Sequence, residues 1–224
     1  MLNELEENCD LKYKEFNDKL IPNVKRTIGI RVPVLRKIAS KIMKEDWRSF
    51  LKEDVIVFEE NLIKAIIIAN AEMSSEERLV LTKEFVPYVD NWAVCDLLCG
   101  DWKITEDATI PLWNFCNELM ESNTEFKMRV AAVMMLFKFL DDDHIDGVLA
   151  LLTLYTNEGY YYKMGAAWAL SYCYIKYEEK TENVLRSGKL DREIHNLTIR
   201  KICESRRIDD VTKQHVKTFR RQYL

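Results

Sequence analysis

The feature that most constrains the fold of this chain is a regular recurrence of paired helical segments. Stretches with apolar residues at helical spacing follow one another in twos, bounded by cap residues or by Gly or Pro. The first helix of each pair is predicted to begin near residues 54, 91, 125, 160 and 191. An interval of roughly 31 to 37 residues is typical of a two-helix solenoid unit. The sequence therefore predicts an all-α, right-handed α-solenoid of HEAT-like helix pairs, with about 10–13 helices.

Composition favours helices over sheets. The 224 residues include only 6 Gly and 4 Pro, and no stretch alternates polar and apolar residues for long enough to indicate a sheet. Before the first pair, residues 2–20 are predicted to form one amphipathic helix that is broken at Pro22, and a basic helix is predicted to begin at Pro33. No linker rich in Pro, Gly or Ser divides the chain, so we predict one HEAT-like repeat domain over residues 1–224.

Neither a membrane protein nor a metal protein is indicated. No stretch approaches the roughly 20 uncharged apolar residues of a membrane span, and the N-terminus is acidic rather than signal-like. The six cysteines are scattered and never form Cys-x-x-Cys. The run from Asp141 to His144 is interpreted as a helix cap rather than a metal cluster. We expect a cytoplasmic monomer without membrane contact, metal or cofactor.

Charge is unevenly distributed along the chain. The net charge is −4, which by itself argues against a polyanionic partner. Residues 19–44 nevertheless carry eight Lys and Arg and no acid, and residues 186–221 carry eleven Lys and Arg against five acids. Two basic ends of this kind can grip a phosphate backbone. The alternative is that each charge run is a solvated helix face.

The segment from Asp90 to Asp96 places an indole and a carboxylate at the start of a predicted helix. Trp92 and Asp96 are four residues apart, a spacing that puts both side chains on one helix face. Such a pair is either part of an active site or a helix cap followed by buried core residues. Two further residues, Arg129 and Trp168, follow at intervals of 37 and 39 residues in the first helices of the next pairs. Equivalent positions of a solenoid line one face, so these side chains are predicted to converge on a concave site.

Four segments together carry a resemblance to a known family. They are Gly29–Ala39 (Gly-Ile-Arg-Val-Pro-Val-Leu-Arg-Lys-Ile-Ala), Trp92–Asp96, Arg129–Ala132 and Trp168–Leu170. In this order and spacing they resemble the DNA alkylation repair family of HEAT-like glycosylases, the AlkD-like proteins. The resemblance extends over nearly the whole chain.

The resemblance implies removal of cationic N3- or N7-alkylated purines from duplex DNA by hydrolysis of the N-glycosidic bond. It implies that Asp96 is the catalytic carboxylate, that Trp92 and Trp168 cradle the sugar and backbone, and that Arg129 holds a phosphate. An alkylated purine is already cationic and leaves as a neutral base, so the reaction needs no general acid. A carboxylate and indole faces can stabilise the positive charge that develops on the sugar. Similar proteins need not flip the base into a pocket, in line with the absence of an evident base pocket in the sequence.

The chain also departs from the family pattern, which reads Ser-Trp-Trp-Asp-x-Val-Asp at the first indole. Asn91 replaces the first Trp, Ala93 replaces the first Asp, and Ser171-Tyr172 replaces an Arg-Glu pair after the second indole. Two alternatives follow: a DNA-structure binder without chemistry, and a HEAT scaffold that binds proteins. The residues expected to contact DNA are Trp92, Arg129, Trp168, Arg31, Arg36, Lys37, Lys163, Arg206 and Arg207.

Overall fold

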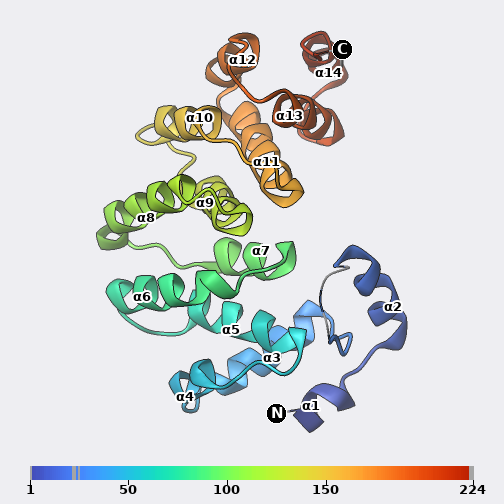
Figure 1. The fold of residues 1–224 in the computed structure, drawn as a ribbon, viewed down its shortest axis with the longest axis vertical. Helices are drawn as coiled ribbons and strands as arrows, with labels where there is room; N and C mark the ends of the chain where they lie inside the picture. Colours follow the sequence, from blue (N-terminus) through green and yellow to red (C-terminus); the bar gives the residue numbers. More distant parts are fainter. Residues whose placement is uncertain (1, 22–23, 25, 222–224) are drawn as a thin grey trace. The chain divides into compact units, whose positions relative to one another are not determined.

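The computed structural model describes residues 2–21, 24 and 26–221, and over this part of the chain it is all-helical (Figure 1). The described residues form fourteen α-helices and two short 3-10 helices, with no β-strand among them. The all-α prediction is confirmed. The chain packs into two compact units, residues 1–105 and residues 106–224. A single repeat domain over residues 1–224 stays a prediction.

The first unit has two layers of helices. Helices α3, α5 and α7 pack side by side in one layer, and α4 and α6 pack against α5 in the other. Its elements are α1 (Leu2–Glu7), α2 (Leu11–Leu20), α3 (Val32–Ile42), α4 (Trp47–Lys52), α5 (Phe58–Asn70), α6 (Ser75–Phe85), η1 (Val86–Tyr88) and α7 (Trp92–Asp101). Helix α5 is apolar on nearly every side, which its place between α3, α7 and the second layer requires.

The second unit repeats this arrangement. Helices α9, α11 and α13 pack side by side, while α8 packs against α9, and α10 and α12 pack against α11. Its elements are η2 (Glu106–Ala108), α8 (Thr109–Glu121), α9 (Glu125–Lys138), α10 (Ile145–Leu154), α11 (Tyr160–Lys176), α12 (Glu178–Arg186), α13 (Arg192–Glu204) and α14 (Asp210–Lys217). Within each unit, the stacking of helix pairs is the local arrangement expected of an α-solenoid.

The predicted first helices correspond to α5, α7, α9, α11 and α13. The last four begin at Trp92, Glu125, Tyr160 and Arg192, within a residue or so of the predicted starts. Helix α5 begins at Phe58, a few residues later than predicted. The delay has a local cause, because the Glu60 carboxylate accepts hydrogen bonds from the backbone N–H groups of Ile56 and Val57 and caps the helix there.

The described residues form more α-helices than the predicted 10–13 for two reasons. The single helix predicted over residues 2–20 is wrong, because Asp10 accepts a hydrogen bond from Tyr13 N at 2.9 Å and starts α2 as a separate helix. The short α4 was not predicted at all. It begins after Asp46, whose carboxylate accepts from Ser49 N, and it buries Trp47. The predicted break at Pro22 lies outside the described residues.

Candidate functional site

The start of α7 carries the Trp92 and Asp96 pair. The Asn91 side chain caps this helix by accepting a hydrogen bond from Val94 N at 3.0 Å, and its amide nitrogen donates to the Asp90 carboxylate at 2.8 Å. Asp96 is the fifth residue of α7, beyond the four N–H groups that a helix start leaves unpaired. Because Asn91 already provides the cap, capping does not explain the carboxylate at position 96.

A cavity of about 200 Å³ lies beside Asp96 within the first unit. Its walls come from α2, from the segment that leads into α3, and from α5 and α7. The residues that line it are Tyr13, Asn17, Ile30, Val32, Phe58, Glu59, Leu62, Trp92, Ala93, Asp96 and Leu97. Sequence analysis found no such pocket, because its walls come from segments far apart in the chain.

Two aromatic side chains of this cavity are held in place by their neighbours. The Trp92 indole donates from Nε1 to the carbonyl oxygen of Leu20, the last residue of α2, at 3.0 Å. The guanidinium of Arg31 lies 4.9 Å from the centre of the Tyr13 ring. Burial raises the pKa of Tyr13, so its phenol is neutral at physiological pH. Helix α2 thus forms one wall of the cavity. Its last carbonyl oxygen also fixes the Trp92 indole, which belongs to the wall formed by α7.

Glu59 is a structural residue of this site that sequence analysis missed. Its side chain is 1% exposed, and its carboxylate accepts hydrogen bonds from Ile28 N at 3.0 Å and from Gly29 N at 2.7 Å. Gly29 has a φ of +92°, and a Cβ added there would lie 2.4 Å from the Cβ of Lys14. Glu59 therefore fixes the loop before α3 against α5, and the missing side chain of Gly29 lets α2 approach that loop closely. Only the glycine of this arrangement stood out in the sequence.

The basic residues predicted to contact DNA in the first unit differ in whether they form ion pairs within the protein. Arg31 pairs with the Asp10 carboxylate at 2.9 Å, and Arg36 forms a two-pronged ion pair with Asp101 at the end of α7. Lys37 is exposed and forms no ion pair with another described residue. Of the three, Lys37 is the one best placed to meet a phosphate group.

In the second unit, two of the predicted DNA contacts are buried. Arg129 is 5% exposed, packs against Gly165 and donates from Nη1 to the carbonyl oxygen of Tyr161 at 2.9 Å. Lys163 is also 5% exposed, with its ammonium 2.8 Å from Glu158 and 2.7 Å from Glu193. The hydrogen bonds that its ammonium donates to these two carboxylates raise the pKa of Lys163. This geometry favours a structural role for both cations, since buried charges in proteins are held by partners.

Trp168 lies in a row of aromatic side chains on the second unit. Its ring meets Phe137 of α9 edge-on at 5.6 Å and Tyr172 of α11 edge-on at 6.2 Å. The guanidinium of Arg207 lies 5.3 Å from the centre of the Tyr172 ring, and Arg206 beside it is exposed. The row combines half-buried rings with a cation, which suits contact with a nucleic acid.

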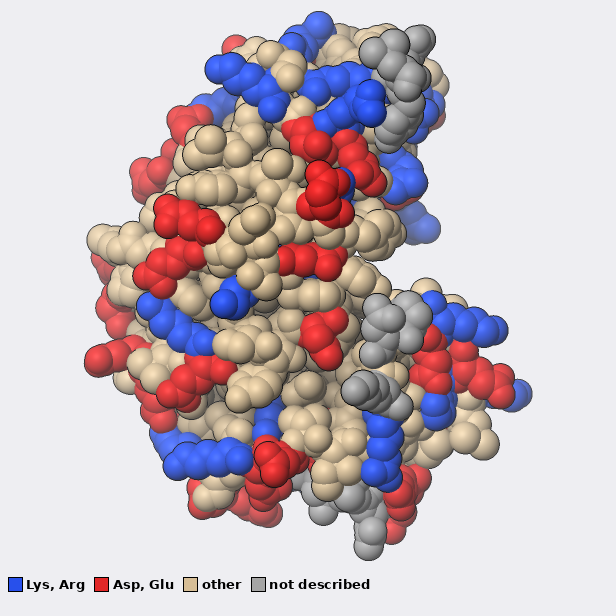
Figure 2. All heavy atoms as spheres, in the orientation of Figure 1, with Lys and Arg blue, Asp and Glu red and all other residues tan. Residues whose placement is uncertain are grey.

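Four of the predicted residues therefore fall into two sets, one in each unit. Trp92 and Asp96 share one cavity in the first unit, and Trp168 and Arg207 belong to one cluster in the second. Convergence of Trp92, Arg129 and Trp168 on one ligand stays a prediction. On the face that Figure 2 draws, each unit shows acidic and basic side chains interspersed.

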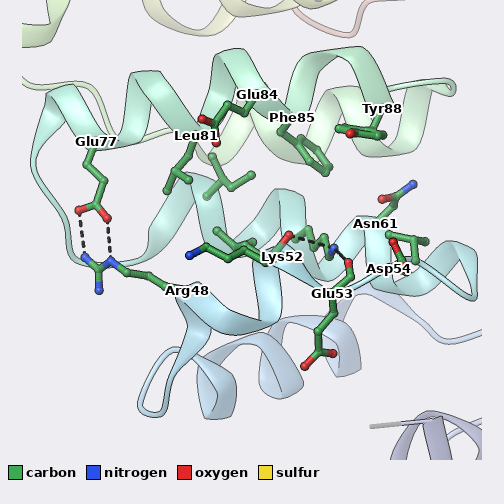
Figure 3. Close-up of a pocket in the computed structure, with 14 residues that line it drawn as sticks. Arg48, Lys52, Glu53, Asp54, Asn61, Glu77, Leu81, Glu84, Phe85 and Tyr88 are labelled. Carbon is green, nitrogen blue, oxygen red and sulfur yellow. Dashed lines mark hydrogen bonds and ion pairs between the residues drawn. The ribbon is translucent and has the colours of Figure 1, made fainter.

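A larger hollow of about 950 Å³ lies between α4, α5 and α6 (Figure 3). The ion pair of Arg48 and Glu77 stands at one end and Tyr88 at the other, with Leu81 and Phe85 between them. Charged side chains of both signs line it, the acids Glu53, Asp54, Glu77 and Glu84 and the cations Arg48, Lys52 and Lys64.

A metal-binding cluster and a membrane-spanning helix are both absent from the described part of the chain. No group of three or more His, Cys, Asp or Glu side chains is arranged there to hold a metal ion. Asp141 accepts hydrogen bonds from the backbone N–H groups of Asp143 and His144 in the turn before α10, but the cap position of that helix is His144, which makes no side-chain cap hydrogen bond. No helix among these residues has the length and the apolar character needed to cross a membrane.

Comparison with known families assigns the chain. The model of the family described as DNA alkylation repair enzyme matches residues 1–204, which include both α7 and the row of aromatic side chains around Trp168. Comparisons with curated proteins and with solved structures gave no match. The matched stretch is far more than half of the 224 residues and ends in the last turns of α13. The chain therefore belongs to the DNA alkylation repair enzyme family.

Proposed function

We propose that this protein is a DNA glycosylase that hydrolyses the N-glycosidic bond of cationic N3- or N7-alkylated purines in duplex DNA. The observation that carries the proposal is the pairing of Trp92 with Asp96 at one cavity, on a helix whose cap is supplied by another residue. Membership of a DNA alkylation repair family supports DNA as the substrate and alkylation as the kind of damage.

In the proposed reaction, the bond between C1′ of the sugar and the ring nitrogen breaks, and its electron pair stays with the base. The base leaves neutral because it was cationic before cleavage, so no proton has to be donated to it. The sugar becomes positively charged, and the Asp96 carboxylate stabilises that charge. Water adds to C1′ and gives up a proton, which Asp96 or the solvent accepts. The products are a free alkylated base and an abasic site.

The proposal assigns DNA contacts to the exposed cations rather than to the buried ones. Lys37, Arg206 and Arg207 are exposed, whereas Lys163 lies between two carboxylates and Arg129 bonds a backbone carbonyl. Affinity for duplex DNA should fall steeply as salt rises and should depend little on sequence, because phosphate contacts dominate.

Substitutions of the two classes of lysine test this assignment. We expect Lys37→Gln to weaken binding of a plain duplex and to reduce the slope of log K against log salt by about 0.9, the value for one phosphate contact. Lys163→Gln should leave the slope unchanged, since its ammonium is neutralised within the protein. Fluorescence anisotropy over a salt series measures both. An equal loss of slope in the two variants would contradict the assignment.

Two assays together separate the proposed function from its alternatives. A mobility shift with plain and abasic-site duplexes reports binding, and a base-release assay on DNA that carries 7-methylguanine or 3-methyladenine reports chemistry. We expect the protein to bind the duplexes and to release the methylated bases. Binding without release would favour a DNA-structure binder, which the replacements at Asn91 and Ala93 make the second candidate. Absence of both would favour a protein-binding scaffold.

A further inference from the structure

Arg207 lies in the turn between α13 and α14, and its side chain contacts an aromatic ring. Its guanidinium lies 5.3 Å from the centre of the Tyr172 ring on α11, within the roughly 6 Å over which a cation and a ring face attract each other. Its backbone N–H donates to the Ser205 hydroxyl at 3.1 Å. Arg207 forms no ion pair with another described residue, so no carboxylate in this part of the chain neutralises its charge.

The contact with the ring leaves the donors of the guanidinium available. The attraction of a ring face acts on the charge of the guanidinium and does not use the N–H groups at its edge. Those N–H groups are the ones with which an arginine binds a phosphate. A long exposed side chain without such a contact has to be ordered when a ligand binds, which costs conformational entropy. Tyr172 therefore reduces the entropy that Arg207 loses on binding.

Tyr172 also places this charge next to the row of aromatic side chains. Its ring meets the Trp168 ring edge-on with 6.2 Å between the ring centres, so one ring separates the guanidinium of Arg207 from Trp168. Trp168 and Tyr172 lie on one face of α11, because they are a single turn apart. A DNA strand whose sugars or bases touch these rings would bring a backbone phosphate to the cation.

The neighbouring Arg206 is not held in this way. Both arginines are exposed, but Arg206 has neither a ring contact nor an ion pair with another described residue. Both lie beyond residue 204, where the match to the DNA alkylation repair family ends, so membership of the family assigns neither of them a role. The two arginines therefore differ in their contact with the Tyr172 ring.

We propose that Tyr172 is a positioning residue, which holds the guanidinium of Arg207 beside Trp168 so that it binds a phosphate of the DNA backbone. The inference rests on the DNA binding that belongs to the proposed function, and it adds the residue that preorganises one phosphate contact. A preorganised side chain binds more tightly because it loses less conformational entropy on binding.

A double-mutant cycle on duplex binding tests whether Tyr172 acts through Arg207. Fluorescence anisotropy measures the affinity of the intact protein for a plain duplex in the wild type, in Tyr172→Leu, in Arg207→Gln and in the double variant. We expect Tyr172→Leu to weaken binding by about threefold when Arg207 is present, the size of an exposed cation–π contact, and to have no effect in Arg207→Gln. Tyr172→Phe keeps the ring and should bind like the wild type.

Two further variants separate the ring contact from charge alone. Arg206→Gln is the matched control, since Arg206 carries the same charge without the ring contact, and its effect should add to that of Tyr172→Leu. Arg207→Lys leaves α11 untouched and keeps the charge but loses the planar group. It should weaken binding by about twofold, with the slope of log K against log salt unchanged. Circular dichroism checks that Tyr172→Leu folds, and Arg207→Lys tests the contact if it does not.

The outcomes of this experiment are distinct from those of the base-release assay. A loss in Tyr172→Leu that depends on Arg207 would support the inference, whether or not the wild type releases bases. An equal loss in the presence and absence of Arg207, or wild-type affinity in Tyr172→Leu or Arg207→Lys, would overturn it and leave the glycosylase proposal intact. A wild type that binds no duplex DNA would overturn both.

Discussion

Asp96→Asn should lower the rate of base release by on the order of 100-fold, because the charge that stabilises the developing cation on the sugar is lost. The fold and the affinity for duplex DNA should be retained, since Asn has nearly the same shape and Asn91 still caps the helix. Affinity should even rise slightly, because a negative charge is removed from the vicinity of phosphates. Single-turnover release of 7-methylguanine at saturating enzyme measures the rate.

The matched control for this prediction is Asp90→Asn. Asp90 is exposed, lies one residue before the cap and does not line the cavity, yet the substitution changes the charge by the same amount. We expect its rate to stay within about twofold of the wild type. A normal rate in Asp96→Asn, or an equal loss in both variants, would contradict a direct role of Asp96.

Glu59→Ala should lower the free energy of unfolding by about 2–4 kcal/mol, because two backbone N–H groups lose their acceptor. These groups belong to Ile28 and Gly29, and the glutamate is almost fully buried. Loosening of the loop should also open the wall that α2 contributes to the cavity. Chemical denaturation followed by tryptophan fluorescence and circular dichroism measures the loss of stability.

Two further variants serve as controls for Glu59→Ala. Glu59→Gln keeps one carbonyl oxygen as an acceptor and should cost less than Glu59→Ala. Glu77→Ala removes a carboxylate whose ion pair with Arg48 is largely exposed, and should cost less than about 1 kcal/mol. If Glu59→Ala lowers the free energy of unfolding no more than Glu77→Ala does, Glu59 does not fix the loop before α3.

Features encoded by local periodicity and cap chemistry could be predicted from the sequence. The starts of α7, α9, α11 and α13 follow from apolar spacing and cap residues, which act over a few residues. The cap at Asn91 is of the Asn or Asp type that helix starts prefer, so it depends on local sequence alone. The shared face of Trp92 and Asp96 follows from their four-residue spacing alone.

Features that depend on which distant residues meet could not be predicted in this way. Glu59 looked like an ordinary helix acid, and only the tertiary structure brings its carboxylate to Gly29. Lys163 looked like a surface cation, but the placement of Glu193 thirty residues later makes it a buried ion pair. The cavity is lined by residues of α2, α5 and α7, so it depends on tertiary packing that cannot be predicted from any one segment.

The central claim, hydrolysis of the glycosidic bond of a cationic purine, is tested most directly by measuring both products of one reaction. Duplex DNA that carries 7-methylguanine is incubated with excess protein, and the free base and the abasic sites are quantified over time. The account predicts that both accumulate in equal amounts, above the spontaneous rate, with no release of unmodified guanine. Duplex bound by the protein but yielding the free base only at the spontaneous rate would contradict it.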